Sequence, residues 1–283
     1  MKPPIRGMHE MTSIGRLLDP GYPTNRAVLV LLPLAGVVAG GVAAAGGAGI
    51  VGVLGRAAGG ALAAFGSWAL AREIAPDDEI AGAFGALALG FIAYLVFEAA
   101  LVPVFVALLF ARIVARTTGL AATGLDSLLV TAVALFAAWW AGSPWPAAAG
   151  AAAFVLDAVL APGLARQWLF AGLCAAGAVA LTSAGLAPAV VPVQPDLPAR
   201  TIGTVLIVGT IALIAATRSC EARGDATDDP LSVTRVRAGQ LATLLTALAW
   251  AAAGTAGIEA GALVWAVLAA ATISAAWRGV TRG

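Results

Sequence analysis

The sequence predicts an all-α fold, a polytopic integral membrane helix bundle of about ten transmembrane helices with the N-terminus and C-terminus in the cytoplasm. Three observations lead there. Of 283 residues, 61% are hydrophobic and 11% are charged, against roughly 45–50% and 25% in an ordinary soluble domain. The apolar residues form long uninterrupted stretches. Arginines gather in alternate connections between these stretches, as the positive-inside rule requires.

A membrane crossing needs about 20 apolar residues, and this length divides the chain into candidate spans. We expect residues 1–26 to be a cytoplasmic amphipathic N-terminal segment, 27–277 a single transmembrane helical domain and 278–283 a cytoplasmic tail. The candidate helices within the domain are 27–46, 49–71, 80–98, 101–117, 126–142, 146–163, 166–186, 201–217, 238–256 and 258–277.

The N-terminal segment precedes the first span. Met8, Met11, Ile14 and Leu18 recur at roughly helical spacing, which predicts a short helix lying on the cytoplasmic membrane surface. The segment has no long apolar stretch with a small-residue cleavage site, so we expect no removable signal peptide.

Two apolar stretches, 27–71 and 80–117, are each long enough for two spans. The first is expected to turn at "AAAGGAGI", where adjacent glycines relax the backbone, or alternatively at "VLGRAAGG". The second is expected to break near Glu98 to Pro103, because proline favours a break.

The distribution of basic residues supports both divisions. Merging 80–117 into one helix would send Arg112, Arg116, Arg166, the 218–237 loop and the C-terminus outside. With ten spans only Arg56 and Arg200 are left off the cytoplasmic side. The cytoplasmic set is then Lys2, Arg6, Arg16, Arg26, Arg72, Arg112, Arg116, Arg166, Arg218, Arg223, Arg235, Arg237, Arg278 and Arg282.

The expected partner of the chain is the lipid bilayer. Lys2 is the only lysine and the formal net charge is +1, so we expect no nucleic-acid partner. The pairs Gly36 with Gly40 and Gly55 with Gly59 have the GxxxG spacing of close helix contacts. Glycine-rich helices of this kind also allow a homo-oligomer or an unknown membrane protein partner.

Several soluble-enzyme motifs lack their parts. His9 is the only histidine, which excludes a Ser-His-Asp triad and a multi-histidine zinc site. "GAGIVG" at 47–52 matches a dinucleotide fingerprint but lies inside an apolar run instead of a strand-to-helix turn. Cys174 and Cys220 have no metal-ligand spacing. We therefore expect no cofactor and no metal, and the catalytic residues remain unknown.

The densest group of charges is "SWALAREIAPDDEIAGAF", in the first cytoplasmic loop. Its members Arg72, Glu73, Asp77 and Asp78 form a candidate cytoplasmic polar cluster. Adjacent Asp77 and Asp78 can hold magnesium and a diphosphate, since hard carboxylate oxygens suit that ion. Their location, with the chain length and helix count, resembles the first aspartate-rich motif of the UbiA family of membrane prenyltransferases.

The sequence departs from that family's pattern at two points. Ala81 stands where a DDxxD motif has its last aspartate. A second acidic cluster, Asp225, Asp228 and Asp229, lies six spans downstream instead of about four. The alternative interpretation is that Asp77 to Glu79 cap the third helix and favour its dipole, and we favour this cap.

Asp157 is the acid placed most clearly inside a predicted span, about 9 Å from its inner end at 1.5 Å per residue. An ionisable group within the membrane is a functional candidate, and a carboxyl group hydrogen-bonded to a neighbouring helix is the equal alternative. Glu98 is a second, weaker candidate intramembrane acid, because the preferred division puts it at an outer turn.

Three functions remain open. Two five-helix halves would have opposite orientations, as in many secondary transporters, and in length and helix count the chain resembles the drug/metabolite transporter superfamily. This favours permease-like transport of a small or amphipathic solute in the cell membrane, with Asp157 as a proton-linked or substrate-facing acid. The alternatives are a lipid or prenyl transferring enzyme using Asp77 and Asp78 with magnesium, and a non-catalytic subunit of a membrane complex.

Overall fold

The computed structural model of the chain describes residues 12–16, 18–78, 80–97, 99–185 and 197–282. Within these ranges the fold is helical and contains no strand. An isolated bridge between Arg223 and Pro230 is the one extended pairing described. The predicted all-α class is confirmed.

Along the described ranges, ten helices of 15 to 25 residues and one of 6 residues follow one another. Each range that the sequence predicts as a span overlaps one of the ten long helices. The helices are α2 (Pro23–Ala45), α3 (Ile50–Ile74), α4 (Ala81–Phe97), α5 (Leu101–Ala115), α6 (Gly124–Trp140), α7 (Trp145–Val159), α8 (Gln167–Ser183), α9 (Leu197–Ala216), α10 (Val233–Ala251), α11 (Thr255–Ala260) and α12 (Ala262–Arg282).

Among the described residues, three helices are long and apolar enough to cross a membrane, judged by length and composition: α2, α3 and residues 262–281 of α12. Others are apolar but shorter, such as α5 and α7 with 15 residues each. Fifteen residues span about 22 Å, less than the roughly 30 Å of a hydrocarbon core. These helices end early because Arg116 adopts a left-handed φ of 50° and Leu160 is extended. Ten crossings therefore remain a prediction.

Both uncertain divisions of the apolar stretches have the form that the sequence favours. α2 ends at Ala45 and α3 begins at Ile50, so the first turn is the glycine-rich one. Gly47 has a φ of 81° there, a conformation that only glycine adopts at no steric cost. The second stretch breaks between Phe97 and Leu101.

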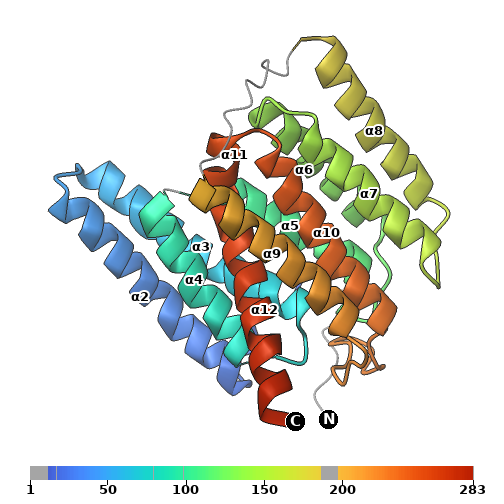
Figure 1. Cartoon of the computed structure of the whole chain (residues 1–283), viewed down its shortest axis with the longest axis horizontal. Coiled ribbons are helices and arrows are strands. Elements are labelled where there is room, and N and C mark those ends of the chain that lie inside the picture. The colour runs from blue at the N-terminus through green and yellow to red at the C-terminus, as the bar shows by residue number, and fades with distance from the viewer. Residues whose placement is uncertain (1–11, 17, 79, 98, 186–196, 283) are drawn as a thin grey trace.

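The helices run alternately up and down. α2, α4, α6, α8 and α10 begin at the same end of the bundle at which α3, α5, α7, α9 and α12 terminate (Figure 1). We call this end, with the connections that cover it, the polar end. The start of α2 and the end of α12 therefore lie at one end of the bundle. Residues 278–282, expected as a tail, continue α12.

The buried side chains form two apolar clusters. One joins α2, α3 and α4 to α9 and α12, and the other joins α6, α7 and α8. α5 and α10 contribute to both clusters. Figure 1 shows the α2–α3 hairpin and the α6–α8 group on opposite sides of these shared helices.

Glycines allow close helix contacts in one of the two predicted pairs. A Cβ on Gly36 or Gly40 of α2 would meet Ala57 of α3 at 3.1–3.2 Å. A Cβ on Gly59 would meet the Tyr94 hydroxyl of α4, whereas one on Gly55 would meet nothing within 4 Å. The first GxxxG pair thus packs between helices, and the second does so only at Gly59.

The N-terminal segment differs from the predicted surface helix. Residues 12–16 are not helical, and Ile14 is buried in the second apolar cluster. The bundle, not the membrane surface, covers this side chain. Met8 and Met11 lie outside the described residues.

Candidate functional site

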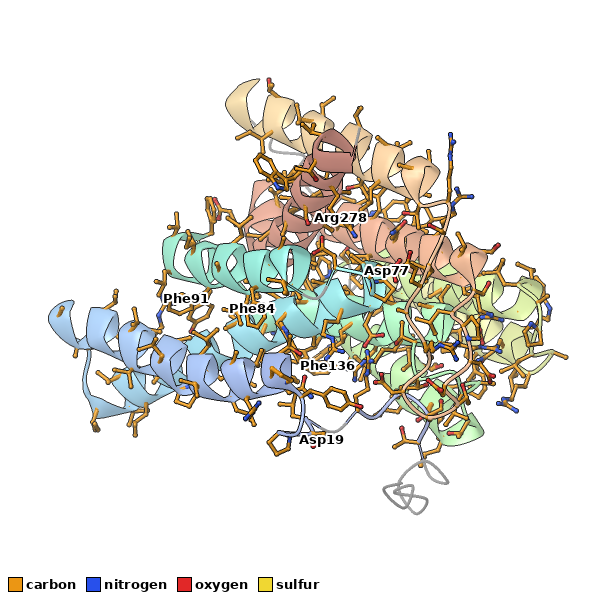
Figure 2. The ribbon with its side chains drawn as sticks, turned by 90° about the horizontal axis from the view of Figure 1, so that it is seen from below. Asp19, Asp77, Phe84, Phe91, Phe136 and Arg278 are labelled. Carbon is orange, nitrogen blue, oxygen red and sulfur yellow. The ribbon has the colours of Figure 1, made fainter. Side chains whose placement is uncertain are left out.

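Charged and polar side chains gather at the polar end of the bundle. Figure 2 looks at the molecule from below and shows Asp77 and Arg278 there, among many nitrogen and oxygen tips. Phe84 and Phe91 follow one another along α4, and Phe91 lies farther from Asp77 and Arg278 (Figure 2). The sequence explains the arrangement, because the polar residues fall at the helix ends and in the connections that meet here.

Asp157 lies in the last turn of α7 and is 0% exposed. Its Oδ1 accepts hydrogen bonds from Arg116 Nε at 2.9 Å and Arg235 Nη1 at 2.8 Å. Its Oδ2 accepts one from Gln167 Nε2 at 2.8 Å. One carboxylate thus joins the ends of α5 and α7 to the starts of α8 and α10.

Arg235 also binds the end of α7 directly. Its guanidinium donates to the carbonyl oxygens of Leu160 and Pro162 at 2.7 and 3.0 Å. A helix C-terminus leaves such carbonyls unpaired and carries a partial negative charge. Arg235 therefore neutralises both Asp157 and the helix end that carries it.

Glu73 forms a second buried centre, on α3. Its side chain is 0% exposed, and Oε1 accepts from Arg16 Nη1 at 3.1 Å and from Arg112 Nε at 3.0 Å. The Thr117 hydroxyl donates to Oε2. Burial alone would lower the pKa of Arg16, but the carboxylates of Glu73 and Asp225 raise it above its ordinary value. Arg16 therefore remains a cation between these two acids.

The four residues of the predicted polar cluster bind different partners, and within the described ranges no two of them share one. Glu73 binds Arg16 and Arg112, as above. Arg72 donates to Asn25 Oδ1 of α2 at 3.2 Å, and its guanidinium lies 5.2 Å from the Trp68 ring centre.

Asp77 faces the connection between α9 and α10. It accepts the backbone N–H groups of Glu221 and Ala222 at 3.0 and 2.8 Å, and the Cys220 thiol at 3.5 Å. Burial and the neighbouring Asp77 carboxylate raise the pKa of that thiol to about 11.

Asp78 faces α4 and α12 instead. Its Oδ1 accepts the Gly82 N–H at 2.9 Å, which is the helix-capping role expected of this acidic run. Its Oδ2 accepts the Ser274 hydroxyl and lies 3.4 Å from Arg278 Nη2. The two adjacent aspartates are therefore turned toward separate elements.

This arrangement bears on the magnesium hypothesis. Among the residues described, no group of three or more His, Cys, Asp or Glu side chains is placed to hold a metal ion. In the second acidic cluster Asp225 pairs with Arg16, and Asp228 lies 3.7 Å from Arg223. The contacts of Asp77 and Asp78 support a role in joining loops and helices.

Two features of the site were not anticipated from the sequence. Asp126 caps α6 in a capping box with Thr123, as expected of an acid in a first turn, but it also binds Thr12 and Ser13 of the N-terminal segment. Arg116 was expected at the cytoplasmic end of the span 101–117 and Arg235 in the 218–237 loop, and neither was expected to bind Asp157, as both do. Glu98, the other candidate intramembrane acid, lies outside the described residues.

The chain was compared with family models, curated proteins and solved structures. No family model, curated protein or solved structure matches it. Membership of the prenyltransferase family or of the drug/metabolite transporter superfamily is therefore not shown, and the contacts of this chain are the basis for a functional proposal.

Chemically, the polar end is a set of fixed pairs between carboxylates and arginines. Each buried carboxylate described above has at least one arginine or several hydrogen-bond donors as partners. Such an arrangement is suited to holding helix ends together, since removing one partner of a buried ion pair costs free energy of folding.

Proposed function

We propose that the chain is a multi-pass membrane protein with permease-like activity toward a small or amphipathic solute. Its ten long helices would cross the bilayer, with the polar end on the cytoplasmic side. The location follows from the arginines gathered there, because cytoplasmic connections collect basic residues. The short helices fit such a bundle if the polar ends of the spans lie in the headgroup region.

One observation carries the proposal. Polar contacts join the N-terminal half (α2–α6) to the C-terminal half (α7–α12) at the polar end. They are Arg116 with Asp157, Arg16 with Asp225, Asp77 with the N–H groups of Glu221 and Ala222, Asp78 with Ser274 and Arg278, and Gln240 with the Ile74 carbonyl.

Alternating access requires each end of a transporter to close by contacts that can also break. Among these contacts, the Arg16–Asp225 pair and the hydrogen bonds of Asp77 are exposed and meet this requirement, because water replaces the partners when the halves separate. Packing at the other end has a different character: Trp140 of α6 meets Trp250 of α10 with ring centres 5.7 Å apart. We infer that the structure has its cytoplasmic end closed.

In this proposal Asp157 is a positioning residue, not the binding site for the solute. Arg116, Arg235 and Gln167 already occupy its oxygens. Its replacement is expected to weaken closure of the cytoplasmic end as a whole. The pairs with greater exposure, such as Arg16 with Asp225, are the ones expected to separate first.

Uptake into proteoliposomes tests the proposal. The probes are ethidium, an amphipathic cation, and a mixture of radiolabelled amino acids. We expect uptake of at least one probe above protein-free liposomes, and a reduced rate in Asp78→Asn, which weakens the contact to α12. Asp228→Asn, in an exposed pair, is the matched control and should transport normally.

Other outcomes would replace the proposal. Magnesium-dependent turnover of a prenyl diphosphate, lost in Asp77→Asn, would favour the enzyme. Stable copurification with another membrane protein, together with no uptake of either probe, would favour a complex subunit.

A further inference from the structure

Residues 12–16, which we name the N-terminal strap, cross the polar end without helical structure. Three helices and two connections hold them. The strap is therefore part of the surface that closes this end, although it precedes α2 by several residues.

Asp126 at the start of α6 holds one end of the strap. Its Oδ1 accepts the Thr12 hydroxyl at 2.6 Å. Its Oδ2 accepts both the N–H and the hydroxyl of Ser13, at 2.9 and 2.8 Å. The same Oδ2 accepts the Thr123 N–H at 2.9 Å to complete the capping box. One carboxylate thus serves the helix cap and the strap together.

The middle of the strap is bound through its backbone and one apolar side chain. Ile14 inserts into the second apolar cluster and is 6% exposed. Arg112 Nη1 donates to the Ile14 carbonyl at 2.9 Å, and the Thr118 hydroxyl donates to the Ser13 carbonyl at 2.8 Å. These contacts place the strap over the end of α5, one of the two helices shared by both clusters.

Arg16 holds the other end. It binds Glu73 of α3 at 3.1 Å and Asp225 in the α9–α10 connection. Arg112 and Thr117 also bind Glu73, so the carboxylate keeps partners when Arg16 leaves. The strap can therefore detach without leaving a buried charge unpaired, which is the costly outcome when an ion pair is broken inside a protein.

We propose that the N-terminal strap is a latch: it seals the polar end over α3, α5 and α6, and it leaves its site on Asp126 and Glu73 when that end opens. The strap has one apolar anchor and a few hydrogen bonds, whereas each helix beneath it is held along its length. It is therefore the element of the polar end that detaches most readily. Its effect on transport rests on the function proposed above.

Cysteine labelling tests the latch without a transport assay. Ser13→Cys is made in a Cys220→Ser background, since Cys174 is buried, and the protein is labelled in nanodiscs with a membrane-impermeant maleimide. Ser13 is buried, so labelling should be slower than at Ser219→Cys, an exposed position.

Two variants should release the strap. Asp126→Asn weakens the strap contacts at one end, and Arg16→Gln removes the ion pairs at the other while leaving the capping box intact. Losing one hydrogen bond to a charged partner shifts an equilibrium by about tenfold or more. Labelling of Ser13→Cys should therefore accelerate by at least about tenfold in each variant. Asp228→Asn should leave the rate unchanged. If neither releasing variant accelerates labelling in protein that remains monodisperse, the latch is refuted.

Ethidium uptake separates the latch from the proposed function. If the wild-type protein transports ethidium, both releasing variants should change the rate, and a rate equal to that of Asp228→Asn would refute control of transport by the strap. If the wild-type protein transports neither ethidium nor amino acids, the permease proposal fails, and accelerated labelling still supports a detachable strap.

Discussion

Asp157→Asn is the most informative single substitution in this chain. It removes the charge that two buried guanidiniums share, since the side chains of Arg116 and Arg235 are only 7% and 4% exposed. Removing one partner of a buried ion pair costs about 3–5 kcal/mol. At about 2–4 °C per kcal/mol for chains of 150–250 residues, the expected fall in Tm is about 6–20 °C.

Thermal stability in detergent, followed by size-exclusion chromatography after heating, measures this fall. Asp228→Asn is the control, because its pair with Arg223 is exposed on both sides and such pairs contribute about 1 kcal/mol or less. The double variant Asp157→Asn with Arg235→Gln should lose less than the sum of the two single variants, because the carboxylate and guanidinium act on each other. A Tm for Asp157→Asn equal to that of Asp228→Asn would refute the reasoning that this carboxylate fastens four helix ends.

Three further predictions concern other parts of the molecule. Maleimide labelling of Cys220 should be a few hundredfold slower than that of an ordinary thiol, because a pKa of about 11 instead of about 8.5 leaves that much less thiolate. Asp77→Asn should accelerate the labelling of Cys220. Equal labelling rates in the wild-type protein and in Asp77→Asn would contradict a docked α9–α10 connection. Gly60→Ala should lower the Tm, because its Cβ would lie 2.5 Å from the Ala39 Cβ and such overpacking costs about 1–3 kcal/mol, whereas Gly55→Ala, with nothing within 4 Å, should not. A topology reporter fused after residue 119 should give a cytoplasmic signal, and an external signal would contradict the proposed threading.

The positions of the helices could be predicted because they follow from local sequence. Apolar length gave the ten ranges, Pro103 indicated the break before α5, and the glycines around Gly47 indicated the first turn. The lengths of the individual helices were harder to predict than their positions. The unwound residues at Arg116 and Leu160 shorten α5 and α7, and hydropathy does not register where a polar helix end stops being helical.

The pairing within the candidate site could not be predicted. Asp157 was singled out for its place in an apolar run, but its partners come from the ends of α5 and α10, 41 and 78 residues away in sequence. Arg235 was counted as a loop residue because the first five residues of α10 include three polar ones, Thr234, Arg235 and Arg237, and so do not read as part of an apolar span. The spacing of Met8, Met11, Ile14 and Leu18 likewise indicated an apolar side without indicating whether lipid or protein covers it; for Ile14 it is protein.

The two apolar clusters share α5 and α10, and this has a consequence for unfolding. When one cluster loses its packing, α5 and α10 lose contacts, and the other cluster depends on the same two helices. Ten of the 15 residues of α5 are buried, so its displacement exposes both sides of the molecule at once. The chain should therefore melt as a single cooperative unit, with no separately surviving half.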